Sequence, residues 1–356
     1  MIVSNESPEG VVHMQISTIG IDLAKNVFQV HGVDAHGKVV LVRQLRRGQM
    51  IAFFAKLPAC LIGMEACATS HHWAREITKL GHEVRLIPPA YVKAYVKRQK
   101  NDAADAAAIC EAVTRPSMRF VPIKTAEQQS ALAVHRTRSL LISQRTQLIN
   151  ALRAHLAELG LVAEQGRDGL ARLIAMLKAD RTLQSLPAAM LQALHAMIAQ
   201  LAALQRQIDE LDRCIEAQHR ASDMSRRLKT IPSIGLLGAT ALTATITDPS
   251  AFKSGRDLAA WIGLVPRQNS SGGKERLGSI TKQGDRYLRR LLVAGAMAVV
   301  QHARRHPEKY PWIARLLARK PAKLVAIAVA NKTARIAWAI MTRGETYRPP
   351  ALLSAT

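Results

Sequence analysis

The sequence predicts a mixed α/β domain at its N-terminal end, a long helical segment after it, and a mostly helical C-terminal domain. Short apolar segments with strand-like alternation are interleaved with helical ones over residues 15–123. Long runs rich in alanine and leucine fill residues 124–222, and residues 223–345 combine helical runs with a basic loop. A chain of 356 residues is long enough for these two or three domains.

The first elements of the N-terminal domain are three strands. Residues 18–24 are β-branched and apolar and end near Asp22, while 28–34 and 38–45 alternate apolar and polar side chains. The turn DAHG at 34–37 separates the second strand from the third. These segments predict an antiparallel three-stranded meander.

Helices and strands alternate in the rest of this domain. A helix is expected around 48–56, a buried strand at 59–66, a helix at 71–81 that ends at Gly81, and a strand at 83–89 that two prolines stop. A last helix runs to about Arg115. This chain order is that of the ribonuclease-H-like nuclease fold.

Four carboxylates fall where such a fold brings its elements together. Asp22 ends the first strand, Glu65 lies near the end of the fourth, and the last helix carries Asp102 and Asp105 three residues apart, on one face. Carboxylates this close need cations, and Mg²⁺ prefers oxygen ligands. Two ions about 4 Å apart suit phosphodiester chemistry. The alternative is a solvated, acidic helix face.

The helical segment is expected to pack against a partner helix, either from the same chain or from a second protomer. A long basic helix at 125–159 carries Arg136, Arg138 and Arg145. A second helix after Pro187 has an apolar seam with steps of three and four residues, which indicates either a coiled coil or a core-facing helix of a bundle. The seam residues are Leu191, Leu194, Ile198, Leu201, Leu204, Ile208, Leu211 and Ile215.

The C-terminal domain opens with a turn between two helices at 228–242, similar to a helix-hairpin-helix, with Ser233 where a glycine is usual. In such motifs backbone amides hold a DNA phosphate. A loop at 266–290 follows, and its cations suit a phosphate path. These are Lys274, Arg276, Lys282, Arg286, Arg289 and Arg290. The apolar helix at 323–341 is expected to lie in the core.

Composition favours a polyanionic partner. The formal net charge is +24, and residues 221–356 hold 23 Lys and Arg against 7 Asp and Glu. Such an excess is typical of nucleic-acid-binding proteins. We expect no membrane association, because no apolar run of spanning length and no secretory signal is seen. The four cysteines lack metal-ligand or disulfide spacing, which is consistent with a reducing cytoplasm.

Six short blocks in order resemble one known family. IGIDLAK, GMEA, NDAADA, TIPSIG, GLVPRQNSSGG and SITKQGDRYLRR span almost the whole chain. Together they resemble the DEDD-type insertion-sequence transposases, which are bridge-RNA-guided recombinases, and above all their IS-one-one-one-one branch. The resemblance implies a RuvC-like domain at 15–123, a coiled-coil region at 124–222 and a transposase domain at 223–345.

The resemblance also implies a mechanism. The family's four acids match Asp22, Glu65, Asp102 and Asp105 and bind Mg²⁺, and its nucleophilic serine matches Ser271, with Ser270 adjacent. That serine holds DNA as a phosphoserine. Composite sites form between protomers of a tetramer built from dimers, and a non-coding guide RNA of the element pairs with donor and target double-stranded DNA. The expected location is the bacterial cytoplasm, in association with DNA.

Two other functions remain open from the residues alone. A metal-dependent, structure-specific junction nuclease needs the four acids and the basic surface but not Ser271. A nucleic-acid-binding protein without catalysis needs only the basic surface. A nucleotide-triphosphate site is not expected, because the chain lacks a GxxxxGK[ST] loop.

Overall fold

The computed structural model describes residues 15–96, 101–162, 186–274 and 276–349. The chain divides into two compact units, Met1–Ala126 and Glu127–Thr356. The three domains expected from the sequence, with bounds at 123 and 222, stay a prediction. The helical segment and the C-terminal region belong to one unit. We describe each unit by itself.

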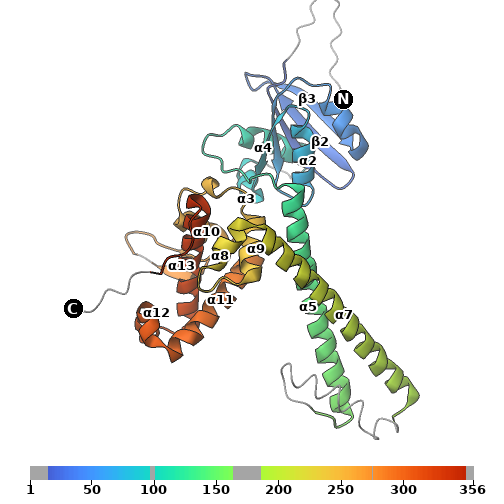
Figure 1. Cartoon of the computed structure of the whole chain (residues 1–356). Coiled ribbons are helices and arrows are strands. Elements are labelled where there is room, and N and C mark those ends of the chain that lie inside the picture. Colours follow the sequence, from blue (N-terminus) through green and yellow to red (C-terminus); the bar gives the residue numbers. More distant parts are fainter. Residues whose placement is uncertain (1–14, 97–100, 163–185, 275, 350–356) are drawn as a thin grey trace, which may run out of the picture. The chain divides into compact units, whose positions relative to one another are not determined.

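The first unit is built on a five-stranded mixed sheet with the order β3-β2-β1-β4-β5 (Figure 1). β1 pairs with β2 antiparallel and with β4 parallel, and β5 continues parallel to β4. This confirms the predicted mixed α/β domain. The strands are β1 Thr18–Leu23, β2 Val27–Val33, β3 Val39–Arg46, β4 Leu61–Glu65 and β5 Glu83–Ile87.

Helices cover this sheet, and its core contains Ile19, Ile21, Phe28, Val30 and Ile62, all fully buried. The helices are η1 Arg47–Gln49, α1 Met50–Phe54, α2 Ser70–Thr78, α3 Pro89–Val92, η2 Lys93–Tyr95 and α4 Asp102–Val113.

The short helices α3 and η2 were not predicted from the sequence. The two prolines after β5 indicated only a stop. The second of them begins α3, where its missing N–H costs nothing and its fixed φ suits a helix.

In the second unit two long helices, α5 Ala126–Glu158 and α7 Ala188–Ala221, form an antiparallel pair (Figure 1). Arg138 pairs with Asp212, and Arg145 donates to Gln205 Oε1 over 2.6 Å. The predicted seam is the packed face of α7: Leu194, Leu201, Ile208 and Ile215 are all buried and lie seven residues apart.

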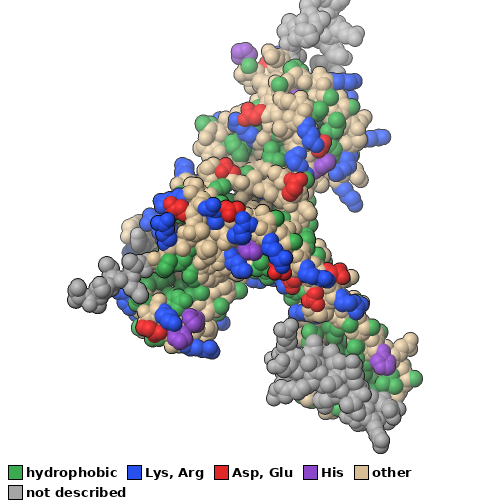
Figure 2. Space-filling view, viewed as in Figure 1, with side chains coloured by type: hydrophobic (Ala, Val, Ile, Leu, Met, Phe, Trp, Pro, Cys, Tyr) green, Lys and Arg blue, Asp and Glu red, His purple; other side chains and the backbone are tan. Residues whose placement is uncertain are grey.

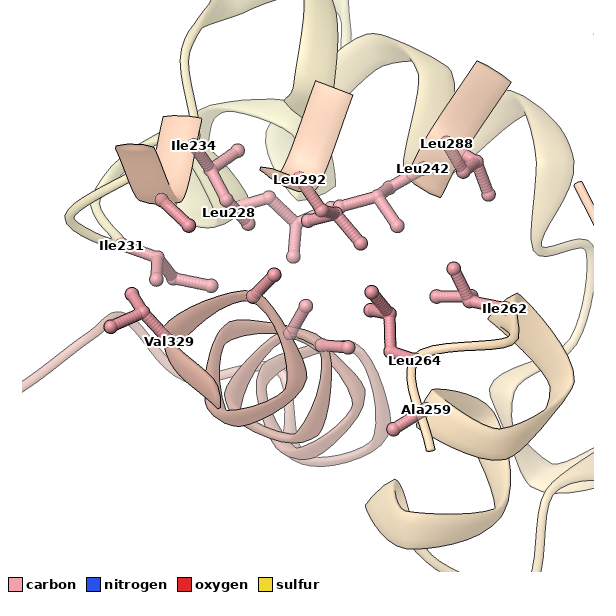
Figure 3. Close-up of a cluster of buried hydrophobic side chains, with 14 of the residues drawn as sticks. Leu228, Ile231, Ile234, Leu242, Ala259, Ile262, Leu264, Leu288, Leu292 and Val329 are labelled. Atoms are coloured by element: carbon pink, nitrogen blue, oxygen red, sulfur yellow. The ribbon is translucent and has the colours of Figure 1, made fainter. Parts of the chain in front are cut away.

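The remaining helices enclose one hydrophobic core (Figure 3). Leu228, Leu242, Leu264, Leu292 and Val329 lie in it, and each comes from a different helix or from the turn after one. The elements are α8 Asp223–Lys229, α9 Leu236–Thr245, η4 Pro249–Ala251, α10 Gly255–Ile262, α11 Arg286–Arg305, η5 Pro307–Lys309, α12 Pro311–Leu317 and α13 Ala322–Arg343.

A two-stranded ribbon interrupts these helices. β6 Pro266–Gln268 pairs antiparallel with β7 Leu277–Ile280. The sequence predicted only a basic loop here, because the strands are short and their side chains are largely exposed, so they carry little apolar pattern.

Two helices, α7 and α13, are long and apolar enough by composition to cross a membrane. The expectation that no segment has this length was therefore wrong. α13 is half buried in the core of the second unit, and α7 packs its apolar seam against α5, so both serve as core helices and no membrane protein is indicated.

Candidate active site

The acidic site of the first unit is formed where β1 ends and α4 begins. Asp22 is the fifth residue of β1, and Asp102 and Asp105 lie in the first turn of α4. A helix N-terminus stabilises nearby negative charge. Asn101 caps this helix, since its side chain accepts a 2.7 Å hydrogen bond from the Ala104 amide.

The alanines around the two aspartates are explained by how closely α4 lies on the sheet. A Cβ atom at Gly20 would lie 2.2 Å from the carbonyl oxygen of Ala106 and 2.4 Å from the amide of Cys110. Ala106 is fully buried at this contact. Small side chains on both elements thus bring the start of α4 to the end of β1.

The three aspartates meet. Asp22, Asp102 and Asp105 each offer one carboxylate oxygen, and these oxygens all lie within 4.8 Å of one another. Burial, then the charges of Asp105, Asp102 and Glu65, raise the pKa of Asp22 to about 6. A hard divalent cation relieves this repulsion and accepts oxygen ligands, so the donor set fits such an ion.

Glu65 ends β4, the parallel neighbour of β1, and is half-buried. Its charge acts on Asp22, but its carboxylate does not belong to the set of oxygens within 4.8 Å. The structure therefore brings three of the four predicted acids together and places the fourth at the margin of the site.

Ser271 lies at the tip of the β6–β7 ribbon. The Lys274 amide donates to the Ser271 carbonyl over 3.1 Å, and Gly272 and Gly273 have φ of +56° and +76°. This is a two-residue hairpin turn of type I′, which requires positive φ at both central residues. Ser271 is exposed at this turn, and its backbone pairs with that of Lys274.

The two adjacent serines differ in their contacts. Ser270 Oγ accepts a 3.2 Å hydrogen bond from the Arg276 amide. Among the described residues, no hydrogen bond to Ser271 Oγ is found. Ser270 therefore braces the ribbon, while the Ser271 hydroxyl is available to a substrate.

The nine predicted nucleic-acid contacts fall into two groups. Some have partners within the chain: Arg138 pairs with Asp212, Arg145 with Gln205, Arg289 donates to the carbonyls of Ile262 and Gln283, and Arg290 donates to Ser139. The first three are half-buried and have contacts within the fold, so their role as phosphate contacts stays a prediction. The exposed group, without such side-chain partners among the described residues, is Arg136, Lys274, Arg276, Lys282 and Arg286.

Basic side chains are also frequent elsewhere on the second unit. On the face seen in Figure 2, Lys and Arg spread over the helices that Figure 1 labels α7 to α10. Sequence reasoning did not assign Asn101, although an asparagine directly before an alanine-rich run is the ordinary signal of a helix cap. Two of the histidines have contacts within the fold: His135 is buried, and His72 packs edge-on against Trp73.

Comparison with known proteins agrees with this architecture. Residues 19–160 match a DEDD transposase family of the IS110 type, and residues 225–311 match the Transposase IS116/IS110/IS902 family. The chain is 50% identical to a probable family 20 transposase of Pseudomonas aeruginosa over 339 residues, 94% of this chain and all of that protein.

Two further relatives are insertion-sequence transposases. Identity is 40% with the transposase of IS1328 from Yersinia enterocolitica, covering 93% of this chain and 98% of that one. It is 39% with the transposase of IS1111A from Coxiella burnetii, covering 94% and 92%. The fold, the acidic cluster and these relatives define a transposase, an enzyme of DNA recombination. The chain belongs to the IS110 family of DEDD transposases, which confirms the family resemblance seen in the sequence.

Proposed function

We propose that this transposase is an RNA-guided DNA recombinase that excises and inserts its own mobile element, with a RuvC-like first unit and Ser271 as nucleophile. The observation that carries the proposal is that one unit holds a three-aspartate cluster and the other an exposed serine at a hairpin turn, whose hydroxyl has no hydrogen bond among the described residues. Family membership and the net charge of +24 support DNA as substrate.

Mg²⁺, as one or two ions, would be held by Asp22, Asp102 and Asp105, with Glu65 at the margin of the site. When bound, Mg²⁺ polarises a phosphodiester and offsets the charge that develops on its oxygens. The carboxylates would hold the ion between β1 and α4, whose backbones approach closely at Gly20. The repulsion among these carboxylates, which contributes to the raised pKa of Asp22, supports a cation at the cluster.

Ser271 acts by direct attack. Its Oγ forms a bond to the phosphorus, one ester P–O bond breaks, and the departing sugar hydroxyl takes up the proton that the serine loses. The covalent phosphoserine conserves the energy of the phosphodiester, so rejoining needs no nucleotide triphosphate. The exposed Lys274 and Arg276 flank the turn and attract the DNA backbone.

Site choice would come from a guide RNA of the element that pairs with donor and target DNA. Few aromatic side chains and many exposed cations suit recognition of backbone and shape, with sequence read by base pairing. Composite sites between the protomers of a dimer or tetramer would bring an acidic cluster to a serine ribbon of another protomer. We expect this assembly in the bacterial cytoplasm.

The test is strand cleavage and strand transfer on element-end DNA, with protein purified together with any RNA that survives high salt. Asp102→Asn and Ser271→Ala should each abolish strand transfer, while Ser270→Ala, the matched control, keeps most of it. A discrete RNA encoded beside the gene should copurify. Strand transfer by Ser271→Ala at the wild-type rate would overturn the serine assignment.

The same variants separate the alternatives. A junction nuclease cleaves branched DNA with Ser271→Ala but not with Asp102→Asn. A protein that only binds nucleic acid is indifferent to both substitutions. Only heterogeneous, salt-labile nucleic acid in the purified protein would contradict RNA guidance.

A further inference from the structure

A second candidate site lies in the C-terminal domain, where α10, α12 and α13 meet. A cavity of about 710 Å³ is lined by the start of α10, by Trp312 of α12 and by one face of α13. Its lining includes Arg256, Lys332, Arg335 and Trp338. This volume is in the range of small-ligand pockets.

The cavity is built by close helix packing. A Cβ atom at Gly255 would lie 2.9 Å from the backbone of Arg335, so the first turn of α10 rests directly on α13. Trp338 Nε1 donates a 3.1 Å hydrogen bond to the Pro249 carbonyl, which fixes its ring in the wall. The walls therefore come from rigid elements.

Trp312 is shared by two cavities. A second hollow of about 510 Å³ is lined by Trp312, Arg315, Leu316, Ala318 and Arg319. The ammonium of Lys332 lies 4.4 Å from the centre of the Trp312 ring, and both residues line the larger cavity. A half-buried indole thus lies among cations from two helices.

The lining of the two cavities, as far as the structure describes it, is basic. Neither cavity has an aspartate or glutamate in its lining, and within the described chain Arg256, Lys332 and Arg335 form no ion pair. Unpaired cations around an aromatic ring match the chemistry of one nucleotide, with a phosphate for the cations and a base for the indole face.

The cavity is distinct from the β6–β7 ribbon that carries Ser271. The cavity lies at the first turn of α10, while the ribbon follows the last turn of that helix. Eight residues of helix span about 12 Å. A nucleotide in the cavity is therefore not the one that Ser271 attacks.

We propose that the cavity bounded by Trp312, Lys332 and Arg335 binds one unpaired nucleotide of a single-stranded stretch of nucleic acid, with its phosphate on the cations and its base on the face of the Trp312 ring that Lys332 leaves uncovered. The inference rests on the proposed function only for the presence of such a stretch. Base stacking tolerates every base, so the site anchors a strand without reading its sequence.

The probes are fluorescently labelled eight-residue oligonucleotides, thymidylate DNA and uridylate RNA, each with an abasic counterpart that keeps the phosphates. Binding is measured by anisotropy across a salt series. Trp312→Ala should weaken binding of at least one base-bearing oligonucleotide about tenfold. The abasic counterparts should bind wild type and Trp312→Ala alike. The strand that responds to Trp312→Ala, DNA or RNA, identifies the source of the nucleotide.

Three further variants make the test decisive. Trp312→Phe keeps a stacking ring and should lose less affinity than the alanine variant, while Lys332→Gln should lower the salt slope by about one. Trp261→Ala removes an exposed tryptophan outside both cavities and serves as the control. Thermal unfolding of every variant monitors the fold.

The proposal is overturned if Trp312→Ala binds all probes as wild type does, or if abasic and base-bearing strands bind equally. A folded Trp312→Phe variant that behaves as the alanine variant also overturns the stacking role. Probe binding requires no strand cleavage, so failure of the serine mechanism leaves this test intact.

Discussion

A Cβ atom on Gly20 of β1 would lie 2.2 Å from the carbonyl oxygen of Ala106 in α4, far inside van der Waals contact. The helix therefore rests on the strand with no side chain between them at this point. The same strand carries Asp22 and the same helix carries Asp102 and Asp105. The separation of the two backbones thus sets how close the three carboxylates lie.

Gly20→Ala is expected to damage both stability and the acidic site. The added methyl group meets backbone atoms that cannot rotate away, so α4 must move, at a cost of about 3 kcal/mol in unfolding free energy. Urea unfolding measures the loss. Gly48→Ala is the matched control, because a Cβ atom there meets nothing within 4 Å. Equal stability of the two variants would contradict the close approach of α4.

Divalent cations should stabilise the first unit through the aspartate cluster. Mg²⁺ at one hundred times its dissociation constant adds about 2.7 kcal/mol to the free energy of unfolding. Asp105→Asn should remove most of this gain, measured as the shift in melting temperature between Mg²⁺ and chelator.

Glu111→Gln is the control for this effect, since Glu111 lies in the same helix but pairs with Arg115. It should keep the Mg²⁺ shift of the wild type. An equal shift in Asp105→Asn would show that the ion binds elsewhere.

Much of the acidic site could be predicted from the sequence, because the positions of its strand and its helix depend on local sequence patterns. A β-branched apolar run located β1, and an alanine-rich run located α4, so Asp22 and Asp102 could be placed at one end of a sheet. The marginal place of Glu65 depends on side-chain directions across two strands, which no local pattern encodes. Likewise, composition marked Arg138 and Arg289 as basic but not that Asp212 and two carbonyls hold them.

The serine turn should depend on backbone conformation rather than on space. Nothing lies within 4 Å of a Cβ atom at Gly272, yet its φ is +56°. Gly272→Val should therefore disrupt the ribbon and reduce strand transfer at least tenfold, because a β-branched residue disfavours positive φ. Gly272→Asn should keep most of the activity, since asparagine tolerates this region.

Strand-transfer assays on both Gly272 variants test this, with circular dichroism as the control for overall folding. Equal activity of the valine and asparagine variants would show that the type I′ turn is not needed for the reaction.

Arg138 is expected to act on the helix pair and not on nucleic acid. Its guanidinium makes two hydrogen bonds to Asp212 and its side chain is only 18% exposed. Arg138→Gln should lower the unfolding free energy of the second unit by about 1 kcal/mol, with DNA affinity and its salt slope unchanged. The exposed Arg136 provides the comparison: Arg136→Gln should leave stability unchanged and lower the salt slope by about one. If Arg138→Gln lowered the salt slope and left stability unchanged, Arg138 would be a phosphate contact after all.

His135 links the long helix α5 to α9 and α11, and its protonation should weaken the second unit in acid. Thr240 Oγ1 donates to the Leu236 carbonyl over 2.9 Å, so it accepts from His135 Nε2 at 3.0 Å. The other ring nitrogen, Nδ1, then accepts from the Tyr287 hydroxyl at 2.9 Å. The neutral imidazole satisfies both partners, and a second ring proton would meet a donor.

Burial, and next the charge of Arg138, lower the pKa of His135 from 6.5 to about 4. Between these values the unfolded chain binds one proton more than the folded chain, so stability falls as the pH falls. The group's contribution is complete above pH 6.5. It amounts to about 3 kcal/mol, lost progressively down to pH 4.

Urea unfolding of the wild type and of His135→Gln between pH 4 and pH 8 isolates this contribution, because other titrating groups cancel in the difference. The glutamine variant should be less stable at neutral pH, and its deficit should shrink as the pH falls. A deficit that stays constant across the series would mean that His135 does not titrate between the two states, and that its helix contacts matter through shape alone.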